Sequence, residues 1–138
     1  MPDVIVPAPT VLDEILAGLS ARQKTLPAKL FYDEAGCALF NAITRLPEYY
    51  VTRAEMALLD RHAAEIAAFA PAGGALIEYG ASDEVKAARL LDAGSRTFAA
   101  YVPVDIAPSS LAAIADRMRE SHPDLMLATI AADFLQPL

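Results

Sequence analysis

The sequence has one cysteine, no tryptophan and fewer basic than acidic residues. Because Cys37 stands alone, no intrachain disulfide can form, which suits a reducing cytoplasm, and we expect the thiol to be a small buried hydrophobe. The 11 lysines and arginines face 18 acids, and the net charge of −7 argues against a nucleic-acid backbone or an anionic membrane as partner.

Long hydrophobic runs are also missing. No stretch approaches the length of a membrane span, and the residues after Met1 contain neither a basic region nor a long apolar one, so we expect no signal peptide and a cytoplasmic protein. Apolar residues are nevertheless abundant. The chain of 138 residues is 55% hydrophobic and 21% charged, which indicates one globular core rather than disorder.

The stretch 75–86 organises the chain. It starts with a short apolar run, which is typical of a buried parallel strand, and continues through Glu78 and Gly80 into a helical pattern. A strand, a tight glycine turn and a helix form the first half of a nucleotide-binding βαβ unit, in which the helix N-terminus faces the ligand. A NAD fingerprint has glycines where Ser82 and Val85 stand here, which disfavours a NAD-binding domain.

The segment before this stretch is predicted to be helical. Thr10 and Asp13 form a candidate N-cap for a helix over 11–19, and Asp33 can cap a second, short helix after a linker at 20–29. The sequence TRAE at 52–55 is a capping-box pattern and predicts the start of a third helix. Its apolar positions recur at spacings of three and four: Met56, Leu59, Ala63, Ile66 and Ala70.

Strands and helices alternate in the second half. Strands are predicted at 75–79, 101–105 and 125–131, and helices at 84–93 and from Pro108 onward, with Leu111, Ile114 and Met118 on the buried side of the latter. Pro103 is unusual inside a strand, because proline donates nothing to the ladder, and it indicates either a bulge or no strand. The alternation predicts an α/β fold with a parallel sheet.

Acids follow the ends of all three predicted strands, at Glu78, Asp105 and Asp133. Ligands of parallel sheets bind at that edge, so the three acids are candidate site residues. Asp105 can accept hydrogen bonds from both hydroxyls of a ribose, and Asp133 can accept from the exocyclic amine of adenine. The alternative for both is a helix cap or a solvated loop acid. Glu78 can instead orient the Gly80 loop by accepting backbone hydrogen bonds.

Three more residues belong to this candidate site. The Phe134 backbone N–H can donate to a ring nitrogen of adenine, and Gly80 lets the backbone approach a ligand without a Cβ. Lys86, on the first turns of the helix, can offset a ligand carboxylate, although a solvated helix face is its plain alternative.

Six segments occur in an order that resembles one family: FYD at 31–33, LPEYY at 46–50, TRAE at 52–55, EYG at 78–80, YVPVD at 101–105 and DF at 133–134. From about residue 26 to 134 the chain is similar to the N-terminal part of the histidine-specific Nα-methyltransferases of ergothioneine biosynthesis. In that family S-adenosylmethionine (SAM) trimethylates the α-amino group of histidine and gives hercynine.

The resemblance implies a cofactor, a substrate and a fold. It implies SAM contacts from Gly80, Lys86, Asp105, Asp133 and Phe134, a substrate contact from Tyr49, and a position beside the reacting amine for Tyr32. Aromatic faces suit a sulfonium and a quaternary ammonium, although ordinary packing is the alternative for Tyr49. No catalytic acid or base is assigned, because an in-line displacement needs positioning and a neutral amine.

The chain also departs from the family. Ser82 replaces the usual second glycine, and the family protein is much longer, with a second domain that supplies most substrate contacts. We therefore expect a helical segment at 1–70 and the first half of a Rossmann-like SAM domain at 71–138, inactive toward histidine alone. The alternative is a non-catalytic or split-subunit half that needs a partner chain.

The family's strand order, 3-2-1-4-5, bears on association. It places strand 75–79 beside a fourth strand that this sequence does not contain. An unpaired apolar edge is a template for another chain, so we expect self-association, a partner chain at that edge, or marginal stability.

Overall fold

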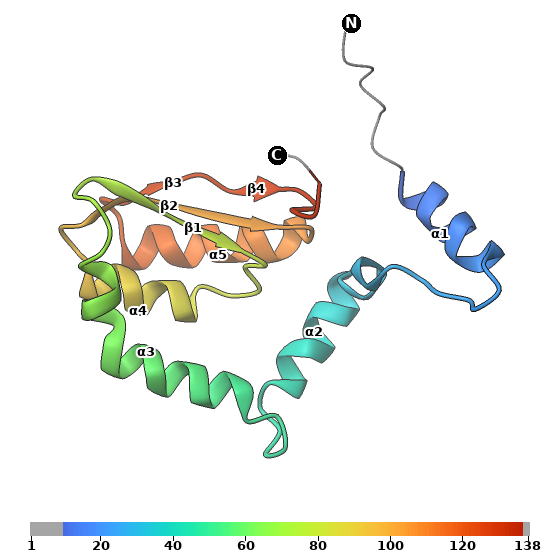
Figure 1. Cartoon of the computed structure of the whole chain (residues 1–138). Coiled ribbons are helices and arrows are strands. Elements are labelled where there is room, and N and C mark those ends of the chain that lie inside the picture. The colour runs from blue at the N-terminus through green and yellow to red at the C-terminus, as the bar shows by residue number, and fades with distance from the viewer. Residues whose placement is uncertain (1–9, 137–138) are drawn as a thin grey trace, which may run out of the picture.

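Four parallel strands with helices on one side form the second half of the molecule, and helices alone form the first half (Figure 1). The computed structural model describes residues 10–136. Its helices are α1 (Val11–Ser20), the 3-10 helix η1 (Ala28–Phe31), α2 (Glu34–Ile43), α3 (Val51–Ala67), α4 (Val85–Ala93) and α5 (Pro108–Ser121). Its strands are β1 (Gly74–Tyr79), β2 (Phe98–Asp105), β3 (Met126–Leu127) and β4 (Ile130–Ala131). The predicted α/β class with a parallel sheet is confirmed.

Two predicted helix caps are confirmed. The Asp13 backbone N–H donates to Thr10 Oγ1 over 3.2 Å and the Thr10 N–H to Asp13 Oδ2 over 2.9 Å, so α1 begins with a full capping box. Asp33 Oδ1 accepts from the Gly36 N–H over 2.7 Å at the start of α2. Each side chain satisfies backbone donors that the first helical turn leaves without a partner.

The predicted capping box at Thr52 is wrong. Helix α3 begins at Val51, its N-cap is Tyr50, and no side chain caps it. Tyr50 already has αR dihedral angles, φ −75° and ψ −15°, and its carbonyl accepts from the Ala54 N–H over 2.9 Å. Thr52 therefore lies inside the first helical turn and cannot act as the N-cap.

β2 lies at the centre of the sheet, with β1 on one side and β3 and β4 on the other. The strand continues through Pro103, and the irregularity in its pairing with β1 lies between Gly74 and Ala75 instead. On its other side, the pairing of β2 is interrupted opposite Pro103. β3 ends opposite Tyr101, and β4 begins opposite Val104. Proline has no N–H to give, which explains why the one strand predicted over 125–131 is two short strands.

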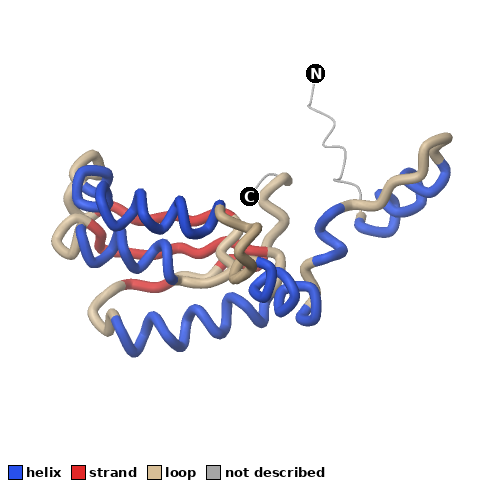
Figure 2. Tube along the Cα trace, turned by 90° about the horizontal axis from the view of Figure 1, so that it is seen from below, coloured by secondary structure: helices blue, strands red, loops and turns tan. Residues whose placement is uncertain are grey.

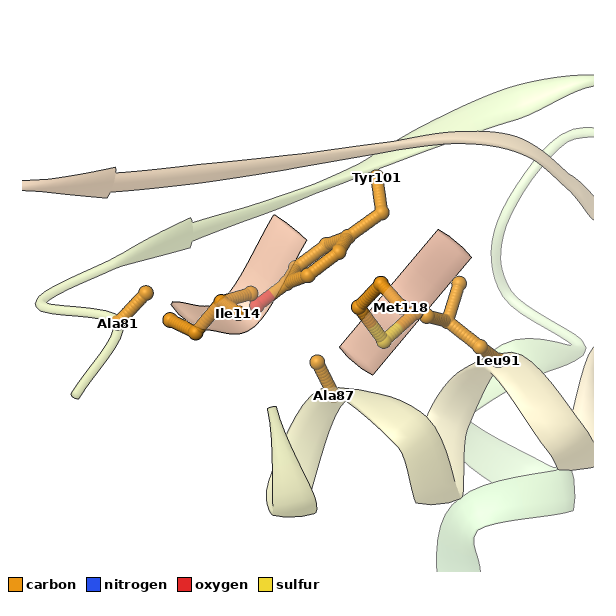
Figure 3. Close-up of a cluster of buried hydrophobic side chains, with 6 residues drawn as sticks. All are labelled: Ala81, Ala87, Leu91, Tyr101, Ile114 and Met118. Atoms are coloured by element: carbon orange, nitrogen blue, oxygen red, sulfur yellow. The ribbon is translucent and has the colours of Figure 1, made fainter. Parts of the chain in front are cut away.

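The core lies between β2 and the helices α4 and α5, which cover one face of the sheet (Figures 1 and 2). Leu111, Ile114 and Met118 are at most 3% exposed, as the sequence predicted. Ile114 and Met118 belong to one buried cluster that also contains the ring of Tyr101 (Figure 3). Buried apolar area of this kind is the main source of folding free energy, so this half holds most of the stability.

Helix α3 packs against α4, so contacts cross the predicted boundary at residue 70. Gly94 makes the approach possible, because a Cβ there would lie 2.9 Å from Ala67 Cβ and 2.8 Å from the Phe98 ring. The predicted α3 helix is present, but Ile66 is 47% exposed and Ala67 is buried in its place. The division into two domains stays a prediction.

The opposite face of the sheet is open within residues 10–136. Ile77 and Tyr79 on β1 and Met126 on β3 are more than half exposed there, and β1 pairs only with β2 along the described chain. Along residues 10–136, every helix is too short or too polar to cross a bilayer.

Candidate functional site

A cavity of about 320 Å³ lies at the carboxyl ends of the strands, where residues from η1 and α2 meet the sheet edge. This is the edge at which parallel sheets bind ligands. Its lining comes from segments far apart in the sequence: Ala28, Lys29, Tyr32, Cys37, Phe40, Asn41, Gly80, Ser82, Lys86, Asp105, Ile106, Ser110, Asp133, Phe134 and Leu135.

The cavity brings together six of the eight residues that the sequence singled out, and Glu78 and Tyr49 do not line it. Gly80, Lys86, Asp105, Asp133 and Phe134, the five predicted cofactor contacts, all line it, and so does Tyr32. The ring of Tyr49 packs edge-on against Phe40, with ring centroids 6.2 Å apart and planes at 82°, and Phe40 forms part of the wall.

Gly80 forms the turn after β1 and has a positive φ of 77°. Its N–H donates to the Val104 carbonyl over 2.8 Å, which fixes the turn to β2. A Cβ on Gly80 would lie 3.8 Å from the Phe134 ring, an ordinary contact. The backbone conformation, rather than lack of space, is therefore what requires glycine here.

Asp105 has one carboxylate oxygen engaged. Its Oδ1 accepts from the Ala107 N–H over 2.8 Å, in the turn that leads into α5. The alternative of a helix cap is wrong, because the N-cap of α5 is Ala107 and no side chain caps that helix, and Asp105 is a partly buried acid at the end of β2 rather than a solvated loop acid. The side chain still lines the cavity, and its second oxygen offers further lone pairs for a ligand.

Asp133 is held by Lys29, a residue that the sequence patterns did not single out. Lys29 Nζ donates to Asp133 Oδ2 over 2.6 Å and to Glu14 Oε1 over 2.7 Å, and the Leu135 N–H donates to Asp133 Oδ1 over 3.1 Å. The hydrogen bond from Lys29 lowers the pKa of Asp133, and the same bond raises the pKa of Lys29. Both groups are therefore ionised across the neutral range.

Phe134 lies against Tyr79, with ring centroids 5.6 Å apart. Within residues 10–136 we find no hydrogen bond from its backbone N–H, so this donor is available to a ligand. Ser82, at the position where the resemblance implies a second glycine, also lines the cavity, and its N–H donates to the Gly80 carbonyl over 3.0 Å.

Glu78 and Lys86 have partners within the protein. Tyr101 Oη donates to Glu78 Oε2 over 2.5 Å, so Glu78 accepts from a core hydroxyl. Burial raises the pKa of Glu78. Lys86 Nζ lies 3.2 Å from Glu55 Oε2 on α3. The second pair attaches Lys86, on the cavity wall, to α3, whereas neither Glu78 nor Tyr101 lines the cavity.

Cys37 is half-buried on the cavity wall, and its Sγ donates to the Tyr32 carbonyl over 3.7 Å. The expectation of a fully buried thiol is therefore wrong. Helix α2, which carries it, has no buried residue among those described. Asn41 and Ser110 complete the polar lining that the sequence patterns missed, because neither belongs to a recognisable motif.

The lining suits a nucleoside that carries a charged tail. The volume lies within the usual range for small-molecule sites. Two carboxylates at successive strand ends can accept hydrogen bonds from hydroxyl and amine donors, and the Phe134 ring offers an apolar face to a base. Lys86 adds a positive charge to the lining.

Comparisons with known proteins agree with this description. A family model described as "Histidine-specific methyltransferase, SAM-dependent" matches residues 11–138. The chain is 37% identical over 127 residues to the histidine N-alpha-methyltransferase of Mycobacterium tuberculosis, which covers 91% of this chain and 39% of that protein. It is 44% identical over 70 residues to ergothioneine biosynthesis protein 1 of Neurospora crassa, 51% of this chain and 8% of that protein.

A further relative carries a different substrate in its name. The chain is 31% identical over 104 residues to the 4-dimethylallyltryptophan N-methyltransferase of Epichloe festucae var. lolii, 74% of this chain and 30% of that protein. The chain therefore spans well under half the length of the curated relatives that it matches.

Proposed function

Because this chain belongs to the family of histidine-specific, SAM-dependent methyltransferases, we propose that its cavity binds SAM. We further propose that the whole protein methylates the α-amino group of an amino acid, with L-histidine the favoured substrate and hercynine the product. The observation that carries the proposal is the meeting of Gly80, Lys86, Asp105, Asp133 and Phe134 in one cavity at the carboxyl edge of the sheet.

The adenosine end is assigned to the two strand-end acids. The free oxygen of Asp105 accepts from the ribose hydroxyls, while Asp133 accepts from the adenine amine and the Phe134 N–H donates to a ring nitrogen. Hydrogen bonds to a carboxylate are charge-assisted and hence stronger than neutral ones. The turn at Gly80 brings backbone close to the ligand, since no Cβ intervenes.

The amino-acid end is assigned to Lys86 and the tyrosines. When bound, SAM supplies a methyl group on a sulfonium. Lys86 offsets the carboxylate of the cofactor's tail, at the expense of part of its pairing with Glu55. Tyr32 lines the cavity and offers an aromatic face to a cationic centre, whereas Tyr49 reaches the cavity wall only through Phe40. Alignment of amine and methyl, rather than proton removal by a strong base, is what these residues contribute.

The first prediction tests the cofactor site. Asp105→Ala removes the acceptor for the ribose hydroxyls and is expected to cost about 1.5–3 kcal/mol of SAM binding free energy, the range for hydrogen bonds to charged groups. Isothermal calorimetry with SAM measures it. The matched control is Asp116→Ala, which removes an equally charged side chain that is 81% exposed on α5.

We expect the control to bind SAM as the unaltered chain does. Equal affinity for SAM in the Asp105→Ala variant and the unaltered chain would contradict the assignment of the ribose to Asp105.

A second candidate function is a cofactor-binding half that works with a partner chain. The open edge of β1 and the exposed apolar face of the sheet favour it. The partner would supply a strand beside β1 and the contacts for the amino-acid substrate.

The second prediction concerns turnover by this chain alone. The 138-residue chain alone is expected to bind SAM but not to methylate histidine at a useful rate, because too few residues hold the amine in line. Mass spectrometry of mono-, di- and trimethylated histidine measures it, with 4-dimethylallyltryptophan as a second substrate. Multiple turnover of histidine by this chain would show that the substrate site is complete within it.

A further inference from the structure

Lys29 joins three segments that lie far apart in the sequence. It belongs to η1, and its ammonium contacts Glu14 on α1 and Asp133 in the loop after β4, 104 positions further along the chain. Both contacts are short, at 2.7 and 2.6 Å. All three side chains are only about a fifth exposed, unlike the ordinary surface pairs of this protein, such as Arg119 with Asp116.

This arrangement goes beyond a surface ion pair, because one ammonium serves two carboxylates. An isolated exposed ion pair contributes little to the folding free energy, since it immobilises two long side chains for one contact in water. Here a single immobilised lysine makes two contacts. Without Lys29, Glu14 and Asp133 would place two negative charges around the same point and repel each other.

The shared lysine leaves Asp133 able to bind a ligand. An ionised carboxylate has about four lone-pair directions. The structure engages two of them, one by Lys29 and one by the Leu135 N–H. These two donors fix the plane of the carboxylate at the cavity wall, and the remaining lone pairs are set before any ligand arrives.

Resting on the proposed function, we infer that Lys29 is a positioning residue for recognition of the adenine amine. It holds the Asp133 carboxylate in the orientation that accepts from an exocyclic amine, and through Glu14 it anchors α1 beside that end of the cavity. An amine at this point of the base donates to Asp133. A carbonyl oxygen at the same point, as in hypoxanthine, would face a negative charge that cannot turn away.

The test compares two probes that differ at that edge of the base: S-adenosylhomocysteine and S-inosylhomocysteine, in which a carbonyl replaces the amine and the neighbouring ring nitrogen carries a proton. Calorimetry gives the affinity of each for the unaltered chain and for Lys29→Met, Lys29→Arg and Lys24→Met. Lys24 is an exposed lysine in the linker before η1, so its variant loses the same charge without touching the cavity. Glu14→Gln completes the set, because it leaves the contact between Lys29 and Asp133 in place.

Lys29→Met is expected to weaken S-adenosylhomocysteine binding about tenfold and to reduce the preference for adenine over hypoxanthine by a similar factor. Lys29→Arg is expected to retain most of the affinity and most of the preference for adenine, because arginine also pairs with carboxylates. Lys24→Met and Glu14→Gln stay within about threefold of the unaltered chain. A merely structural lysine would change overall affinity but leave the preference between the two bases as it was.

Three outcomes overturn the inference. One is that Lys29→Met keeps the preference for adenine over hypoxanthine unchanged. Another is that Lys24→Met loses as much affinity and preference as Lys29→Met does. The third is an unaltered chain that binds neither probe, which rejects the proposed function itself. Circular dichroism establishes that each variant is folded. If Lys29→Met is not folded, the same comparison is made with the double variant Lys29→Gln and Glu14→Gln, in which the repulsion between residue 14 and Asp133 is also removed.

Discussion

At the scale of single residues, the pair of Glu78 and Tyr101 connects the core with the turn at Gly80. The Tyr101 side chain is completely buried, and its hydroxyl donates to the Glu78 carboxylate two residues before Gly80. Burial dominates the shift that raises the pKa of Glu78, followed by opposing contributions from Tyr101 and Lys86 and a further raising one from Asp83. Ionising this carboxyl therefore costs the folded chain stability.

The third prediction concerns the pH dependence of this cost. The folded chain holds the Glu78 proton more tightly than the unfolded chain does, because the pKa of Glu78 is raised by folding. The free energy of folding therefore becomes less favourable as the pH rises through the unfolded-state pKa near 4.5, and the whole penalty is present above the folded-state pKa. Glu78→Gln removes the penalty while its amide oxygen still accepts from Tyr101. Its stability relative to the unaltered chain should therefore increase as the pH rises through and above 4.5.

Urea unfolding at several pH values measures this difference, and Glu120→Gln, exposed on α5, is the control for the loss of one surface acid. A difference that stays flat or falls over the same range would show that burial does not penalise the Glu78 carboxylate.

At the scale of elements, the loop 46–50 is held by the helix that follows it. The Arg53 guanidinium on α3 donates to the carbonyls of Leu46 and Pro47 over 2.8 and 2.5 Å, and more weakly to that of Tyr49 over 3.4 Å. These contacts explain why TRAE follows LPEYY in the sequence although Thr52 caps nothing. The arginine fixes the loop, and the loop places Tyr49 against Phe40 beside the cavity.

The fourth prediction follows from these contacts. Arg53→Met leaves the loop carbonyls without their donor, so we expect amide exchange at Tyr49 and Tyr50 to become roughly five- to thirtyfold faster, the equivalent of about 1–2 kcal/mol of local stability. Hydrogen exchange followed by NMR measures it. Arg61→Met, on the exposed side of α3, is the matched control and should leave both rates as they were. Equal acceleration in the two variants would mean that Arg53 supports the helix rather than the loop.

At the scale of the whole molecule, the sheet is covered on one face and open on the other. Helices α4 and α5 bury one side of β2, while Ile77 and Tyr79 on β1 remain 53% and 57% exposed on the other. The outer edge of β1 carries no strand within residues 10–136. An apolar face beside an unpaired edge is a surface on which strands from other chains can pair.

The fifth prediction is that this chain self-associates through the open side of its sheet. Light scattering after size-exclusion chromatography should give a mass that rises with concentration. Ile77→Lys places a charge on the exposed face of β1 and is expected to shift the mass toward the monomer. Leu19→Lys, which charges a similarly exposed apolar position on α1, should not.

A cooperative monomer at every concentration that binds no hydrophobic dye would contradict this prediction. Loss of association in Leu19→Lys alone would move the contact from the sheet to α1.

Local patterns in the sequence determined the elements and the edge at which the site lies. The caps at Thr10 and Asp33 and the turn at Gly80 depend on neighbouring residues, and the structure has them where the sequence predicted. The alternation of strands and helices is also present, although the strand predicted over 125–131 is two short strands. Asp105 and Asp133 reach one cavity because parallel strands end at the same edge, a rule of topology that needs no knowledge of packing. The order of six short segments was enough to indicate the family.

Only the tertiary structure decided which side chains meet. Lys29 and Asp133 are 104 positions apart, and nothing in either neighbourhood encodes their contact. The place of Tyr49 behind Phe40 and the bond from Tyr101 to Glu78 likewise depend on how helices and strands pack. The interruption between β3 and β4 depends on Pro103 of the neighbouring strand, because a missing N–H matters only to the chain that lies beside it.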